Sequence, residues 1–114
     1  MTKMEERLKE AKECVEILGK EYQGLIGPFG VLKRRSVEED GALPSKTKRL
    51  IALALAVATG CEWCIALHTK GALDAGATKD EIIEACFVAV LMGGGPALMY
   101  TQLVLKAIEE FKKD

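Results

Sequence analysis

The sequence predicts an all-α protein, a compact bundle of about six helices formed by a single domain over residues 1–114. Apolar residues recur at spacings of three and four, and no segment alternates with the two-residue period of a strand. Glycine and proline interrupt the chain at helix-length intervals. The composition, 49% hydrophobic and 29% charged, is that of an ordinary globular domain.

The first helix is expected over residues 4–22, where Leu8, Val15 and Leu18 belong to one apolar stripe. Glycines then interrupt the pattern, and a short second helix is expected from about residue 28 to 38, with Pro28 near its first turn. Cys14 lies in the stripe of the first helix, where we expect it to be buried.

The third helix is expected to begin at Pro44 or Ser45 and to run to about residue 59. The run from Leu50 to Ala58 has no polar stripe, so this helix should be buried on every side. Gly60 is expected to end it as a C-cap. Burying such a helix in so small a chain predicts self-association.

The fourth helix, from residue 61 or 62 to 75, carries Cys61, Cys64 and His68 at spacings of three and four. These spacings bring side chains together on one helix face, so two thiols and one imidazole share a patch. Trp63 and Leu67 lie further round the helix and favour a second buried contact.

The fifth helix begins at a capping box formed by Thr78 and Glu81. Cys86 lies in its apolar run and is expected to be buried. A glycine-rich turn over residues 93–96 then ends it, and the last helix is expected over residues 96–111.

Charge and hydropathy exclude several classes of partner. The net charge of -1 and the 5% aromatic content argue against nucleic-acid binding. Residues 1–13 lack the apolar region of a signal peptide, and the apolar run is too short for a bilayer, which needs about 20 residues. We therefore expect a cytoplasmic protein with no membrane partner.

The cysteine patch offers two candidate nucleophiles. A thiol reacts as its thiolate, which a helix N-terminus or a nearby cationic histidine stabilises. Cys64, one turn from His68, would reduce a hydroperoxide and become a sulfenic acid that Cys61 condenses with. Cys61, at the helix start, would instead act on protein or cofactor disulfides.

Two other interpretations of the patch stay open. One is a zinc site formed by Cys61, Cys64 and His68, although only Cys86 or Cys14 is available as a fourth ligand and both are expected elsewhere. The other is a structural helix that carries two cysteines and a core histidine. The redox interpretation needs neither a bound metal nor a cofactor.

Residues 46–58, 60–68 and 75–85 resemble the carboxymuconolactone decarboxylase family, specifically its AhpD-like alkylhydroperoxidase branch. The resemblance covers about residues 40–112. It implies an all-helical fold assembled as homotrimers or homohexamers. It also implies a CxxC-dependent peroxidase that reduces hydroperoxides and is itself reduced by a dithiol, such as a lipoyl-type carrier protein. By the same resemblance Cys64 is the peroxidatic thiol, Cys61 the resolving thiol and His68 the relay base.

The sequence departs from this pattern at Arg49, where the AhpD-like branch has a relay glutamate twelve residues before the first cysteine. A guanidinium cannot accept a proton. Arg49 either stabilises a thiolate from within the patch or turns to solvent with Lys46 and Lys48. Glu84 is the other acid expected near the site. The lactone decarboxylase branch works without the cysteine pair, which makes decarboxylation an alternative function.

Overall fold

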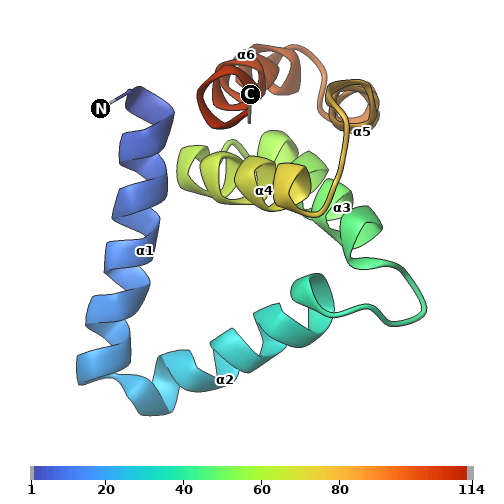
Figure 1. Ribbon diagram of the computed structural model, residues 1–114. Helices are drawn as coiled ribbons and strands as arrows, with labels where there is room; N and C mark the ends of the chain where they lie inside the picture. The colour runs from blue at the N-terminus through green and yellow to red at the C-terminus, as the bar shows by residue number, and fades with distance from the viewer. Residues whose placement is uncertain (1, 113–114) are drawn as a thin grey trace.

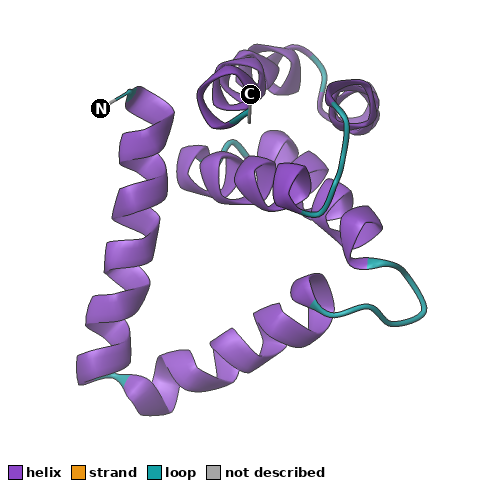
Figure 2. Cartoon of the chain, in the orientation of Figure 1, coloured by secondary structure: helices purple, strands orange, loops and turns teal. Residues whose placement is uncertain are grey.

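The computed structural model describes residues 2–112, and every regular element in that range is helical (Figure 2). A π-helical segment, Arg34–Glu38, follows the second of six α-helices. The α-helices are α1 Lys3–Glu21, α2 Gln23–Lys33, α3 Ser45–Thr59, α4 Glu62–Asp74, α5 Lys79–Gly93 and α6 Gly95–Phe111. The predicted all-α class is confirmed. Within the described range, no helix is long and apolar enough to cross a bilayer.

Three helix ends fall where the sequence placed them. Gly60 ends α3 with φ of 72°, a left-handed conformation that glycine adopts without strain. Thr78 caps α5: its side chain accepts the backbone N–H of Glu81, and the Glu81 carboxylate accepts the N–H of Thr78 at 2.9 Å. Gly94, with φ of 70°, separates α5 from α6.

The predicted bounds of the second helix were wrong. Helix α2 begins at Gln23, directly after Tyr22, which caps both α1 and α2. Pro28 therefore lies inside the helix, where its ring approaches the carbonyl four residues earlier. That residue is Gly24, and a Cβ atom placed on it would meet no other side chain within 4 Å. The glycines that indicated a break lie within the helix, because the low helix propensity of glycine is a weak preference and not a prohibition.

The core lies among α3, α4, α5 and α6, and α1 closes one side (Figure 1). Helix α3 packs against α4 and α5, and α6 packs against the same two helices. Cys86 is fully buried, as predicted. The other buried hydrophobic residues are Met4, Leu53, Ala56, Val57, Ile65, Ala66, Ala72, Ala77, Ile82, Ala89, Ala97, Val104, Ala107 and Ile108.

Helices α1 and α2 form a V-shaped arm beside the other four helices (Figure 1). Only the first part of the α1 stripe is covered: Met4 is buried and Leu8 packs on the core, but Val15 is 55% exposed. The prediction that Cys14 is buried was wrong, since it is exposed on this arm. Helical periodicity identified the apolar stripe, but the chain does not supply a surface to cover all of it.

Within the single chain α3 is not buried on every side, and the prediction that it is buried all round depends on self-association, which stays a prediction. Leu53 and Val57 are fully buried, but Ile51 is 47% exposed and Leu55 is 60% exposed. One side of α3 packs on α4 and α5, and no helix of the described residues covers these two side chains. They belong to a wider set of exposed apolar residues, considered in the Discussion.

Candidate functional site

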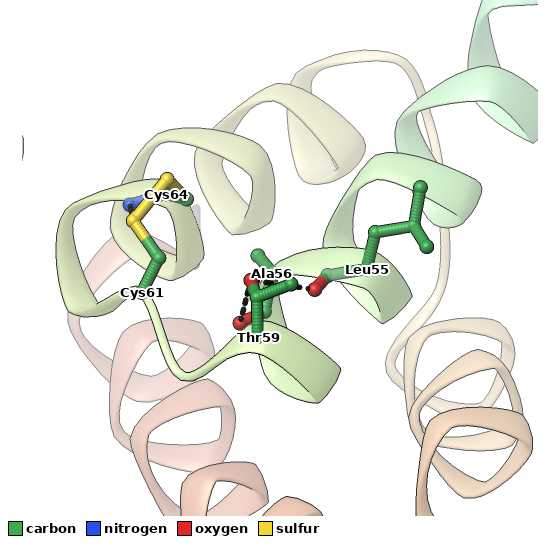
Figure 3. The surroundings of a disulfide bond; sticks show 5 residues. All are labelled: Leu55, Ala56, Thr59, Cys61 and Cys64. Atoms are coloured by element: carbon green, nitrogen blue, oxygen red, sulfur yellow. Dashed lines mark hydrogen bonds between the residues drawn. A yellow bond between two sulfur atoms is a disulfide. The ribbon is translucent and has the colours of Figure 1, made fainter. Parts of the chain in front are cut away.

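The cysteine pair lies at the junction of α3 and α4. Gly60 and Cys61 link the two helices, and their backbone N–H groups both bond to the carbonyl of Ala56, at 3.0 and 3.1 Å. The hydroxyl of Thr59 donates to the carbonyls of Leu55 and Ala56 (Figure 3). These bonds satisfy the carbonyl groups at the end of α3 and fix the direction in which α4 leaves it.

Cys61 is the N-cap of α4 and forms a disulfide with Cys64 (Figure 3). The Cα atoms of the two residues are 5.2 Å apart. The Cys61 sulfur accepts the backbone N–H of Cys64, with N and Sγ 3.2 Å apart. A sulfur at the N-cap occupies the place of the usual capping oxygen, next to the positive end of the helix dipole. This geometry favours a thiolate on Cys61 when the pair is reduced.

His68 lies one helical turn beyond Cys64 on α4, and its side chain is half-buried. Its Nδ1 atom is buried and has no hydrogen-bond partner among the described residues. Burial is the main cause that lowers the pKa of His68 to about 4, and the charges of Arg49 and Lys33 lower it further. The imidazole is therefore neutral at pH 7. It can accept a proton, but it is a weak base.

Arg49 faces α4 rather than solvent. A Cβ atom placed on Gly71 would lie 2.6 Å from Nη1 of Arg49 and 2.9 Å from its Cζ, so the guanidinium occupies the space that the glycine leaves free. Gly71 is three residues beyond His68 and seven beyond Cys64, on the same helix face. Lys46 and Lys48 point elsewhere, Lys46 to Glu81 at 3.0 Å and Lys48 to the Arg35 carbonyl at 3.3 Å.

The structure does not bring Glu84 to the cysteines. Glu84 is exposed on α5, which packs mainly against α3 and α6. Within residues 2–112, it makes no hydrogen bond or ion pair with Cys61, Cys64 or His68. No contact therefore supports the expectation that Glu84 lies near the site. The same part of the chain holds no group of three or more His, Cys, Asp or Glu side chains arranged for a metal ion, which leaves the zinc alternative without support.

Sequence reasoning missed a set of contacts from α1 to the two residues between the cysteines. Arg7 donates from Nε to Glu62 Oε1 at 3.3 Å and from Nη1 to Glu10 Oε1 at 2.9 Å. Glu10 Oε1 also accepts Nε1–H of Trp63 at 3.0 Å. The Arg7 Cζ atom lies 5.1 Å from the centroid of the Trp63 ring. We call these four residues the α1 clamp.

The α1 clamp had only a partial sequence signal. Arg7 and Glu10 are three residues apart on one face of α1, a spacing typical of an ion pair. Nothing in the sequence links them to Glu62 or Trp63, more than fifty positions later. The hydrogen bond from Trp63, followed by that from Arg7, lowers the pKa of Glu10. Trp63 packs on α1 but is 46% exposed, so the second buried contact predicted for Trp63 and Leu67 is only partly formed within the single chain.

The remaining cysteines differ in reactivity. Cys86 is buried, and burial raises the pKa of its thiol to about 11, so it stays protonated and inert. Cys14 is exposed on α1 and lines a surface hollow with Glu10, Ala11 and Trp63. Neither forms a disulfide in the described part of the chain.

Comparison with known proteins places this site in a family. The model of the carboxymuconolactone decarboxylase family matches residues 31–107, which is most of the chain. The chain belongs to the carboxymuconolactone decarboxylase family. The matched range contains Arg49, both cysteines of the disulfide and His68, but not the α1 residues of the clamp.

The family assignment agrees with a solved structure and two sequence relatives. The crystal structure of apo-lpg0406, a carboxymuconolactone decarboxylase family protein from Legionella pneumophila, is similar with a TM-score of 0.92 and 41% sequence identity. That similarity covers 97% of this chain and 98% of the other. An uncharacterised protein of Cupriavidus necator is 38% identical, covering 91% of each chain. An uncharacterised protein of Haemophilus influenzae is 35% identical, covering 93% of each chain.

Proposed function

We propose that this protein is a thiol–disulfide oxidoreductase of the AhpD-like type, with Cys61 and Cys64 as its redox-active pair. The observation that carries the proposal is the position of Cys61 as the N-cap of α4, bonded to Cys64 and facing the N–H of that residue. An N–H group aimed at sulfur and the helix dipole both stabilise a thiolate at this position. A stabilised thiolate is the reacting species in disulfide exchange.

In the proposed reaction the Cys61 thiolate attacks one sulfur of a substrate disulfide. An S–S bond to Cys61 forms, the substrate S–S bond breaks, and one substrate thiolate leaves. The Cys64 thiol then loses its proton and attacks the Cys61 sulfur, which releases the second substrate thiolate and forms the Cys61–Cys64 disulfide. The protein dithiol is oxidised by two electrons and the substrate is reduced by two. The reverse direction oxidises a dithiol, such as that of a lipoyl-type carrier protein.

The order of attack follows from how the two sulfurs are placed. Cys64 packs against the hydrophobic core, whereas Cys61 is the N-cap of the helix. The thiol whose thiolate the helix N-terminus stabilises attacks the substrate disulfide first, and the thiol packed on the core resolves the mixed disulfide. Both residues are half-buried, so a substrate sulfur still has access to the pair.

Hydroperoxide reduction is the second candidate function, and the neutral His68 one turn from Cys64 favours it. A neutral imidazole can take the Cys64 proton, the thiolate cleaves the O–O bond to give an alcohol and a sulfenic acid, and Cys61 condenses with that acid to release water. The low pKa of His68 makes it a weak base for this step. Arg49, in place of the relay glutamate, cannot pass the proton on. Disulfide exchange is favoured over peroxide reduction, because it needs neither a strong base nor a relay acid.

The test uses a Cys14→Ser background, because the exposed Cys14 would otherwise react as well. The reduced protein is treated with 2-hydroxyethyl disulfide or with cumene hydroperoxide, and intact mass is measured after alkylation of the remaining thiols. With the disulfide, we expect the parent protein to lose two thiols, and Cys64→Ser to accumulate a mixed disulfide on Cys61. With the hydroperoxide, Cys61→Ser should trap a sulfenic acid on Cys64 that dimedone labels.

The double variant Cys61→Ser, Cys64→Ser is the matched control, and only the buried Cys86 remains in it. If the parent protein loses no thiols to either oxidant, the proposed function is wrong. A trapped mixed disulfide on Cys64 rather than Cys61 would reverse the proposed order of attack. Decarboxylation of a lactone that survives in the double variant would favour the other branch of the family.

A further inference from the structure

The residues between the two cysteines are held from outside their own helix. Glu62 and Trp63 lie in the first turn of α4 between the cysteines. Arg7 of α1 contacts both of them, and Glu10 of α1 accepts a hydrogen bond from Trp63. A second cation, Lys3, lies 3.8 Å from Glu62 but is 58% exposed. Arg7 is the better shielded cation, with 23% of its side chain exposed. Arg7 is therefore the main cation that pairs with Glu62.

We propose that Arg7 is a positioning residue that stabilises the reduced form of the Cys61–Cys64 pair, so that docking of α1 and reduction of the pair favour each other. The proposal deepens the proposed function and rests on it, because the pair must be able to exchange electrons. It assigns α1, which lies outside the segment matched by the family model, a direct part in the chemistry of the site.

The physical basis is the charge that reduction creates. A neutral disulfide takes up two electrons and one proton to give one thiolate and one thiol. The thiolate is favoured on Cys61, whose sulfur faces the helix N-terminus, and Glu62 is the next residue in the chain. An unpaired Glu62 carboxylate would repel this thiolate. Arg7 pairs with Glu62 and offsets its charge, which reduces this repulsion.

The coupling also acts in the opposite direction. A contact that stabilises the reduced pair must, by thermodynamic linkage, be strengthened when the pair is reduced. Reduction should therefore tighten the hold of α1 on α4, and oxidation should loosen it. Trp63 reports on this contact, since it is the single tryptophan of the chain and its Nε1–H bonds to Glu10.

The test is a redox titration of the full-length protein, in the Cys14→Ser background, with mixtures of reduced and oxidised glutathione. The fraction of disulfide is measured by alkylation and intact mass. Arg7→Gln leaves Glu62 and Glu10 without their shared cation and should favour the disulfide by roughly threefold in the equilibrium constant, as for a partly exposed ion pair. Glu10→Gln removes a negative charge while its amide oxygen can still accept from Trp63. It should shift the constant in the opposite direction.

Opposite shifts separate the charge effect from simple loosening of α1, which would move both variants the same way. Lys9→Gln and Glu13→Gln are matched controls, because they remove the same charges from an exposed ion pair of α1 that does not reach α4. Arg7→Lys keeps the charge and should stay close to the parent protein. Hydrogen exchange of α1 should be slower in the reduced parent protein than in the oxidised one, and this difference should shrink in Arg7→Gln.

The outcomes distinguish the inference from the function on which it rests. If glutathione and dithiothreitol both fail to reduce the pair in the parent protein, the proposed function fails. If the pair titrates normally but Arg7→Gln behaves like Lys9→Gln, the function stands and the role of Arg7 is overturned. The same conclusion follows if Arg7→Gln and Glu10→Gln shift the equilibrium in the same direction.

Discussion

At the scale of single residues, the site is defined by what surrounds His68. Its Nδ1 has no partner among the described residues, and Arg49 approaches the same helix face at Gly71. A carboxylate at position 49 would attract the imidazolium form, whereas the guanidinium repels it. The positive charge of Arg49 therefore lowers the pKa of His68. It adds to the larger effect of burial and makes the imidazole a weaker base.

This predicts how His68 responds to Arg49→Gln. His68 is the single histidine of the chain, so its NMR titration can be followed without assignment. We expect it to titrate near pH 4 in the parent protein and at higher pH in Arg49→Gln, although burial continues to lower its pKa. Lys46→Gln, which removes a charge paired with Glu81, is the control and should leave the titration unchanged. If the pKa of His68 is unchanged in Arg49→Gln, the guanidinium of Arg49 does not act on the imidazole.

The same shift gives stability a defined pH dependence. Above pH 6.5 the histidine is neutral in both folded and unfolded chains and contributes nothing. Between pH 6.5 and about 4 the unfolded chain binds a proton that the folded chain does not. The free energy of unfolding therefore decreases as the pH is lowered through this range, and the decrease levels off below pH 4. Arg49→Gln should raise the pKa of His68 in the folded chain, so the pH range over which stability changes should end above pH 4.

At the scale of elements, the caps decide where the helices begin. Thr78 and Glu81 exchange two hydrogen bonds at the start of α5, in which each side chain accepts the backbone N–H of the other residue. This cap also places Glu81 opposite Lys46 of α3. The local signal and the tertiary contact therefore act on the same turn, which explains why the sequence located this boundary correctly.

Removal of the Thr78 cap should destabilise the protein measurably. We expect Thr78→Ala to lower the free energy of unfolding by about 1 kcal/mol, because the N–H of Glu81 loses its acceptor. Urea denaturation provides the measurement. Thr59→Ala is the control: its hydroxyl bonds only to carbonyls of its own helix, and its loss should have a smaller effect. Equal effects from the two variants would mean that the cap is not the source of the stability.

At the scale of the whole molecule, the single chain leaves many large apolar side chains exposed. Leu91 and Met92 at the end of α5 are both 81% exposed, and Leu25 of α2 is 78% exposed. The others are Val15, Ile17, Tyr22, Phe29, Val31, Leu32, Leu43, Ile51, Leu55, Trp63, Phe87, Val88, Leu98, Met99 and Leu105. Monomeric soluble proteins rarely expose contiguous apolar surface on this scale.

Because these apolar residues are exposed in the single chain, we predict that the protein self-associates. We expect sedimentation at micromolar concentration to detect a closed assembly, a homotrimer or homohexamer. Leu91→Glu should weaken it, because burying an unpaired carboxylate in an apolar interface is unfavourable. Lys106→Glu on α6 is the matched surface control. A parent protein that sediments as a monomer would contradict the prediction.

The sequence by itself determined the helices from α3 to α6 and the shared face of Cys61, Cys64 and His68. These features depend on short-range rules: apolar spacing, Gly60 and Gly94 at helix ends, and the cap at Thr78. The cluster of Cys61, Cys64 and His68 was predictable for the same reason, since its members lie within two turns of one helix. The same rules failed for α2, whose glycines and Pro28 are typical of a break but lie within the helix, because helix propensity is only a weak preference.

Only the tertiary structure decided which faces meet. Cys14 and Cys86 occupy similar apolar stripes, yet one is exposed and the other buried, because α5 is covered by α3 and α6 while α1 is covered only in part. The pairing of Arg49 with Gly71 and the hold of Arg7 on Glu62 join residues 22 and 55 positions apart. Helical periodicity fixes the direction in which a side chain points from the axis of its own helix. What that side chain touches depends on where the other helices pack.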